Sequence, residues 1–226
     1  MKRWTQLLSQ FLTVIRRCGW ALLILSILSN YGEQGLTHLM ENELSSMEGA
    51  SPWVWLYGAA SVGISVLSPV IMSILVIAAL LPSTVTASLQ QHAQYVCKET
   101  LRAAGKSLSW GLLLVIPGLI RFLQFSFVPF VVMLDPEYDR GQKDALQEST
   151  RLVHRRFFKV TGILILFSIL LPLLLTGLDE YSAFDQHVFP ALLLAGLDAV
   201  ISIFAILMLL NQWEKSHGTH VQLETN

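Results

Sequence analysis

Two ionisable residues inside apolar stretches are the strongest candidates for chemistry in this 226-residue chain. Arg121 lies in the stretch 109–134, and Asp198 lies near the middle of the stretch 190–212. A charged side chain in a bilayer costs roughly 2.5–3.5 kcal/mol on insertion scales, so it usually faces a partner or water. Two interpretations stay open: Arg121 and Asp198 flank a polar cavity, or they form a buried ion pair. We prefer the ion pair.

The other reactive residue types do not have the spacing of an active site. His217 and His220 are spaced like a metal-binding pair, but they lie in a polar tail without a third ligand. Ser149 has no histidine or aspartate at a telling distance. The chain also contains no phosphate-binding glycine loop, zinc-protease motif or nucleophile elbow. We therefore expect a protein that is not an enzyme, with no catalytic residue, bound metal or cofactor.

Basic residues form candidate sites for lipid headgroups. Lys98, Arg102 and Lys106 repeat every four residues, which places them on one face of a helix. A basic residue close to an anionic leaflet contributes about 1 kcal/mol to membrane binding. The alternative interpretation is a solvated helix face. A second basic group consists of Arg151, Arg155, Arg156 and Lys159.

The distribution of charge indicates how these residues are positioned. No Lys or Arg occurs from Cys18 to Cys97 or from Val160 to Glu214. Only 14% of the residues are charged, against about 25% in globular domains. Lys and Arg near membrane spans stay on the cytoplasmic side. The pattern predicts an all-α, polytopic membrane protein with its N-terminus and C-terminus in the cytoplasm.

Four apolar segments are predicted to cross the membrane completely. Ser51 and Pro52 are typical of a helix start, and a surface helix over 4–15 is expected to precede the first span. The predicted spans are 18–37, 52–81, 160–178 and 190–212 in a single domain 1–213, followed by a polar, disordered tail 214–226.

The remaining apolar stretch, 109–134, is interrupted by Pro117, Gly118, Gln124 and Pro129. Basic segments flank it, so a single crossing would place one of them outside. A double crossing needs about 40 residues. We therefore predict a re-entrant hairpin, broken near Pro117 or between Gln124 and Pro129. It should pack inside the bundle, because non-helical backbone in a bilayer needs a cover of protein or water. Cytoplasmic amphipathic helices are expected on either side, at 84–108 and 141–158.

Residues 114–160 resemble a loose superfamily of bacterial inner-membrane proteins. The matching residues are Pro117, Gly118, Arg121, Pro129, Ala145, Leu146, Ser149 and Leu152. The superfamily includes the YciC-like proteins, the DUF975 family and the membrane domain attached to some glycerophosphodiester phosphodiesterases. This chain departs from the pattern at His154-Arg155, where a glycine is usual. The resemblance implies a bacterial inner-membrane location, but it does not extend to the phosphodiesterase domain, so that activity is not implied.

These patterns predict a non-enzymatic, multi-pass inner-membrane protein that acts through membrane lipids or protein partners in assembly or envelope maintenance. A homo-oligomer is compatible with this, and nucleic-acid binding is not expected. The alternative is a small oligomeric transporter or channel with a polar site near Arg121 and Asp198, since transporters use broken helices of this kind. An intramembrane enzyme that acts on lipids would need polar groups converging on one pocket.

Overall fold

The computed structural model describes residues 2–46, 51–81, 89–113, 115–175 and 188–217, and all secondary structure in these ranges is helical. Within them, five apolar segments are long enough to cross a membrane: Trp4–Ser45, Pro52–Leu80, Ile116–Leu134, Phe157–Leu175 and Leu193–Ser216. The prediction of a helical membrane protein is thereby confirmed. The helices are α1 (Lys2–Ser46), α2 (Pro52–Leu80), α3 (Leu89–Leu113), α4 (Val115–Gln124), α5 (Val128–Leu134), α6 (Pro136–Asp139), α7 (Ala145–Arg155), α8 (Phe157–Ile165), the π-helical segment η2 (Leu166–Leu170) and α10 (Val188–His217).

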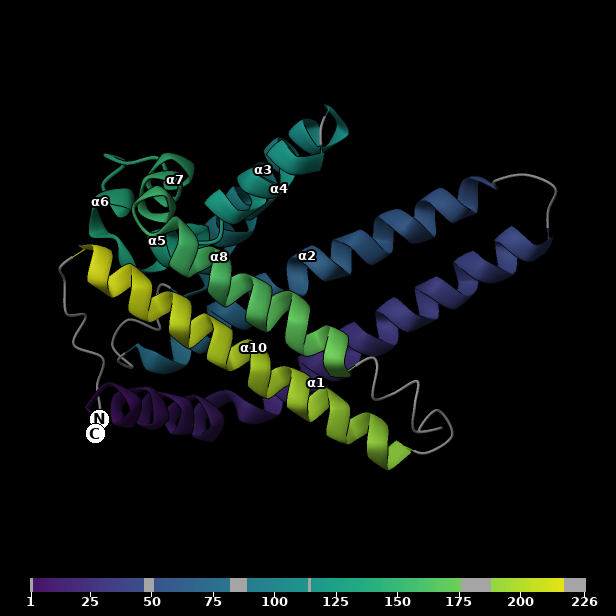
Figure 1. The fold of residues 1–226 in the computed structure, drawn as a ribbon, viewed down its shortest axis with the longest axis horizontal. Helices are drawn as coiled ribbons and strands as arrows, with labels where there is room; N and C mark the ends of the chain where they lie inside the picture. The colour runs from purple at the N-terminus through teal and green to yellow at the C-terminus, as the bar shows by residue number, and fades with distance from the viewer. Residues whose placement is uncertain (1, 47–50, 82–88, 114, 176–187, 218–226) are drawn as a thin grey trace.

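Helices α1 and α2 form a long antiparallel pair (Figure 1). Ser65 of α2 donates a hydrogen bond to the Glu33 carboxylate of α1 at 2.8 Å. The sequence pattern predicted a separate surface helix over 4–15, but α1 is one continuous helix of 45 residues. No proline interrupts it. At 1.5 Å per residue its length is about 68 Å, which exceeds the roughly 45 Å of a whole bilayer.

The short helix α5 is the centre of the core. Val128, Phe130, Val131 and Val132 are each at most 1% exposed, and α5 packs against α2, α3 and α7. The predicted burial of the whole stretch 109–134 holds for α5 and for Leu123, Phe125 and Phe127 just before it. Helix α4 keeps an apolar face open, with Ile116, Leu119, Ile120 and Phe122 all exposed.

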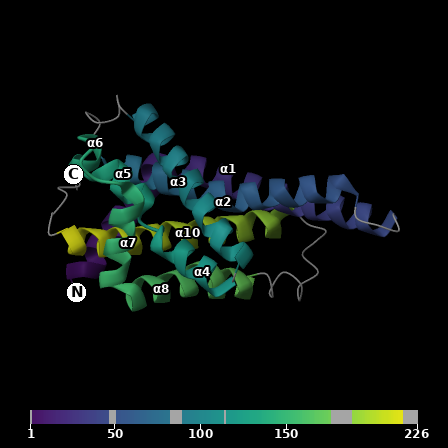
Figure 2. The same ribbon diagram turned by 90° about the horizontal axis from the view of Figure 1, so that it is seen from above.

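Helix α10 lies between the α1–α2 pair and α8 (Figure 2). Its Phe204 ring stacks on Phe11 of α1 with 4.6 Å between the ring centroids. The last predicted span, 190–212, is shorter than α10, which continues to His217. The first residues of the predicted tail, 214–217, are therefore helical and not disordered. Residues 218–226 lie outside the described part of the chain.

Candidate functional site

The turn between α4 and α5 is completed by a side chain from another helix. Residues 125–127 are not helical. The Ser149 hydroxyl of α7 donates to the carbonyl oxygen of Gln124 at 2.7 Å and accepts from the backbone N–H of Phe127 at 3.1 Å. The helix break expected between Gln124 and Pro129 is therefore present. The Ser149 side chain satisfies two of the backbone groups that this break frees.

Helix α7 brings Ser149 to this position because one face of the helix points into the core. The Asp144 carboxylate caps the helix by accepting from the backbone N–H groups of Leu146 and Gln147 at 2.9 and 3.2 Å. Successive helical turns then direct their small and apolar side chains inward. The buried residues of α7 include Ala145, Leu146, Ser149, Leu152 and Val153. The α7 residues that match the superfamily pattern therefore lie on the face that packs into the core.

The structure places Arg121 and Asp198 apart, each with its own polar partner. Arg121 donates to the Gln124 side-chain oxygen at 3.1 Å, and its guanidinium lies 5.7 Å from the centroid of the Trp110 ring. Asp198 accepts a 2.9 Å hydrogen bond from the buried hydroxyl of Ser26 in α1. No ion pair joins the two charges within the described ranges, so these contacts replace the preferred Arg121–Asp198 pair. The role of Ser26 could not be predicted, because no feature of the sequence links this residue to Asp198.

The first basic group is divided between paired and free side chains. Arg102 of α3 contacts Glu99 at 3.2 Å and the Asp144 cap at 2.9 Å. Lys98 and Lys106 are exposed. In the part of the chain that the structure describes, neither makes a side-chain hydrogen bond or ion pair. The predicted basic face therefore has two free ammonium groups and one guanidinium that links α3 to α7.

The second basic group is divided in the same way. Arg151 pairs with Glu148 at 2.7 Å. Arg156 donates to the Gln212 side chain at 3.1 Å and to the carbonyl oxygen of Lys215 at 3.0 Å, which fixes the end of α10. The side chains of Arg155 and Lys159 are exposed and have no partner among the residues in the described ranges.

An ion network joins α6 to the start of α7. Lys143 bonds to the carboxylates of Glu137 and Asp135, and hydrogen bonding, first to Glu137, raises its pKa. Burial by itself would raise the pKa of Asp144. The N–H groups of Gln147 and Leu146 and the Arg102 guanidinium outweigh burial, so the pKa is lowered. Hydrogen bonding to Asp144 in turn raises the pKa of Arg102. This network holds α3, α6 and α7 together.

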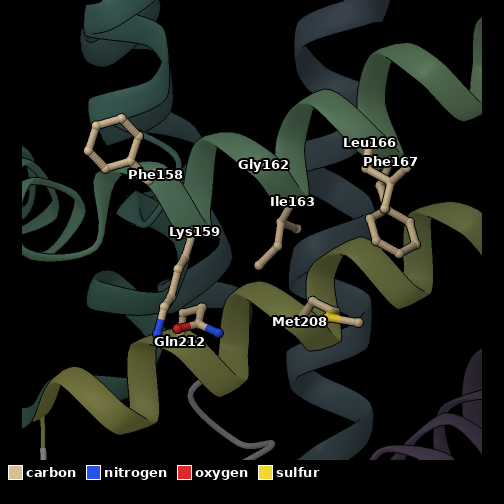
Figure 3. A pocket seen from close by; sticks show the side chains of 8 residues that line it. All are labelled: Phe158, Lys159, Gly162, Ile163, Leu166, Phe167, Met208 and Gln212. Atoms are coloured by element: carbon tan, nitrogen blue, oxygen red, sulfur yellow. The ribbon is translucent and has the colours of Figure 1, made fainter.

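A groove of about 360 Å³ runs between α8–η2 and α10 (Figure 3). Lys159 and Gln212 lie side by side at one end, while Phe167 and Met208 lie towards the other. Neither Arg121 nor Asp198 lines it. The lining residues are Phe158, Lys159, Gly162, Ile163, Leu166, Phe167, Met208 and Gln212.

Comparisons with protein families, with curated proteins and with solved structures gave no match for this chain. The resemblance of residues 114–160 to the YciC-like superfamily therefore stays a prediction. Cys18 and Cys97 are free thiols. Within the described ranges, no three His, Cys, Asp or Glu side chains are grouped so that they could hold a metal ion.

Proposed function

We propose that this chain is a non-enzymatic, multi-pass protein of the bacterial inner membrane that acts through anionic lipids or protein partners. The observation that carries the proposal is the set of free cationic side chains on α3, α7 and α8. A cation beside an anionic leaflet is stabilised electrostatically relative to the same cation in bulk water. In the described residues these free cations are Lys98, Lys106, Arg155 and Lys159.

The proposed topology has four full crossings and a re-entrant hairpin, with both termini in the cytoplasm. The Arg121–Trp110 contact supports a hairpin, because it joins residues on either side of the α3–α4 junction. Lys106 lies seven residues before Leu113, which is about 10 Å of helix. With Lys106 at the headgroups, the hairpin tip would reach only about a third of the way through a 30 Å hydrocarbon core.

The side chains at the hairpin tip support insertion into lipid. Leu108, Trp110, Ile116 and Leu119 are all between 46% and 72% exposed. Apolar side chains with this much exposed surface are favourable in hydrocarbon, whereas their exposure to water costs free energy. Helix α4, which is about 15 Å long, would then return the chain to the cytoplasmic side, and α5 would follow inside the protein core. The stretch Ile116–Leu134 would accordingly not cross the membrane.

The alternative, an oligomeric transporter or channel, has less support. It requires a polar site near Arg121 and Asp198, but each of these residues has a partner of its own. The groove between α8 and α10 contains neither residue. A broken helix at α4–α5 is present, but its freed backbone is bonded to Ser149 and not exposed to a pathway.

Native mass spectrometry of the protein extracted in a mild non-ionic detergent tests the proposed function. We expect a stoichiometric protein partner, or retention of phosphatidylglycerol in preference to phosphatidylcholine. The double variant Lys98→Gln/Lys106→Gln should retain less anionic lipid than the wild type. A monomer that carries no lipid and no partner, or that does not discriminate between the two lipids, would contradict the proposal.

A further inference from the structure

The groove between α8–η2 and α10 combines an apolar floor with a polar end made of hydrogen-bond donors. Ile163, Leu166, Phe167 and Met208 supply apolar surface along its length. From Lys159 to Phe167 the helix rises roughly 12 Å. The groove is therefore long enough for part of an acyl chain, and it is open along the surface that faces lipid in the proposed topology.

One of the two donors at the polar end, the Gln212 side chain, is held in place by a neighbour. The Gln212 side-chain oxygen accepts from Arg156 at 3.1 Å. That bond leaves the Gln212 NH₂ group without an acceptor in the described residues, and it turns this group towards the groove. In Figure 3 the Lys159 ammonium lies at the same end of the groove, on the side of the Gln212 oxygen, and it is likewise unpaired within those ranges. Two donors without an acceptor at one end of a groove, one of them cationic, are complementary to the oxygens of a phosphate group.

We propose that this groove binds one anionic phospholipid of the cytoplasmic leaflet, which deepens the proposed function and rests on it. The phosphate accepts hydrogen bonds from Lys159 and Gln212, and an acyl chain lies along Ile163, Leu166 and Met208. A helix of a second copy fits the groove less well. Its apolar side chains would remove Lys159 from water and give it no counter-charge.

Gly162 makes the inference directly testable. A Cβ atom added at Gly162 meets no heavy atom within 4 Å, and the residue lines the groove. The substitution Gly162→Leu therefore adds apolar volume in the groove from a Cβ position that is free of contacts, and Leu has a higher helix propensity than Gly. Gly58 of α2 is also surrounded by open space but lies outside the groove, so Gly58→Leu is the matched control.

The experiment is native mass spectrometry in dodecyl maltoside with added palmitoyl-oleoyl phosphatidylglycerol, and phosphatidylcholine with the same chains as the comparison lipid. We expect Lys159→Gln to lower the affinity for phosphatidylglycerol roughly fivefold, equivalent to about 1 kcal/mol. The charge control Lys98→Gln should change it less than Lys159→Gln. Gly162→Leu should abolish the tightest binding event for both lipids, whereas Gly58→Leu should leave it unchanged.

Three results would overturn the groove assignment. If Lys159→Gln and Gly162→Leu bind phosphatidylglycerol like the wild type, the lipid lies elsewhere, although the broader proposal of a lipid-dependent protein survives. If Gly162→Leu converts a wild-type dimer into a monomer with unchanged lipid binding, a second copy occupies the groove. If the wild type binds neither lipid and has no partner, the proposed function fails together with the groove.

Discussion

At the scale of single residues, the Ser149 hydroxyl replaces two backbone hydrogen bonds that the α4–α5 turn removes. It is fully buried, with one donor contact to Gln124 and one acceptor contact from Phe127. A buried backbone group that loses its partner costs about 1–3 kcal/mol. Ser149 therefore holds the turn, a role that does not require reactivity.

Replacing Ser149 by Ala is expected to lower the free energy of unfolding by about 2 kcal/mol, because Gln124 and Phe127 lose their partner. Thr150→Ala is the control, since its hydroxyl bonds only to Leu146 of the same helix. That change should stay within about 0.5 kcal/mol. SDS-induced unfolding in mixed micelles measures both. Equal stability of the two variants would show that Ser149 does not hold the turn.

Acidification should weaken the start of α7 through Asp144. Its pKa lies below the ordinary value of about 3.9. The folded protein therefore binds this proton less tightly than the unfolded chain. The stability that the carboxylate contributes is present above about pH 4 and is lost as the pH falls through the lowered pKa.

The variant Asp144→Asn keeps a capping side chain but cannot be titrated. We expect the wild type to lose more thermal stability than Asp144→Asn between pH 5 and pH 3. Thermal melts in dodecyl maltoside across this range measure the difference. Parallel pH profiles would mean that ionisation of Asp144 has no effect on stability.

The limits of sequence reasoning are clearest at this scale. Arg121 and Asp198 were identifiable because charges are rare in apolar stretches. Their partners were not identifiable, because Gln124 and Ser26 are ordinary polar residues whose proximity depends on helix packing. The role of Ser149 was hidden for the same reason: its two contacts lie 22 and 25 residues away in the chain.

At the scale of elements, Arg17 fixes how α1 and α2 align. Its guanidinium donates to the carbonyl oxygens of Ala79 and Leu81 at 2.9 and 3.5 Å, at the end of α2. The last carbonyls of a helix have no intrahelical donor and carry partial negative charge. A cation at this position both completes the hydrogen bonds and compensates that charge.

Arg17→Ala should lower the free energy of unfolding by about 1 kcal/mol. The neighbouring Arg16→Ala removes the same charge from an exposed side chain that makes no side-chain contact in the described residues. It should cost less than about 0.5 kcal/mol. Unfolding in mixed micelles compares the two variants. An equal loss for both would assign the effect to net charge alone.

The elements themselves were largely predictable, because long apolar runs leave helices as the stable backbone in lipid. Ser51 and Pro52 mark the start of α2 as expected, with the Ser51 hydroxyl accepting from the backbone N–H of Trp53. The unbroken course of α1 was missed, since Arg16 and Arg17 resemble the end of a surface helix. In the structure both arginine side chains are exposed on the surface of α1, and the helix continues past them.

At the scale of the whole molecule, the start of α1 lies at the same end of the bundle as the end of α10 (Figure 1). An even number of crossings produces this arrangement. We expect cysteines placed at Lys106 and Arg140, in a background without Cys18 and Cys97, to be labelled from the cytoplasmic side only. Labelling with a membrane-impermeant maleimide in right-side-out and inverted vesicles measures this. Positions 106 and 140 on opposite faces would overturn the re-entrant topology.

The π-helical segment η2 determines where the chain should tolerate the deletion of one residue. A π-segment inside an α-helix holds one surplus residue for its turn. Removing one of the residues from Ser168 to Leu170, which do not line the groove, should restore the ordinary ladder and leave the groove residues in place. A one-residue deletion at the start of α8 would instead turn the groove residues away from α10. Tolerance to deletion, scored as folded yield, should therefore peak within η2.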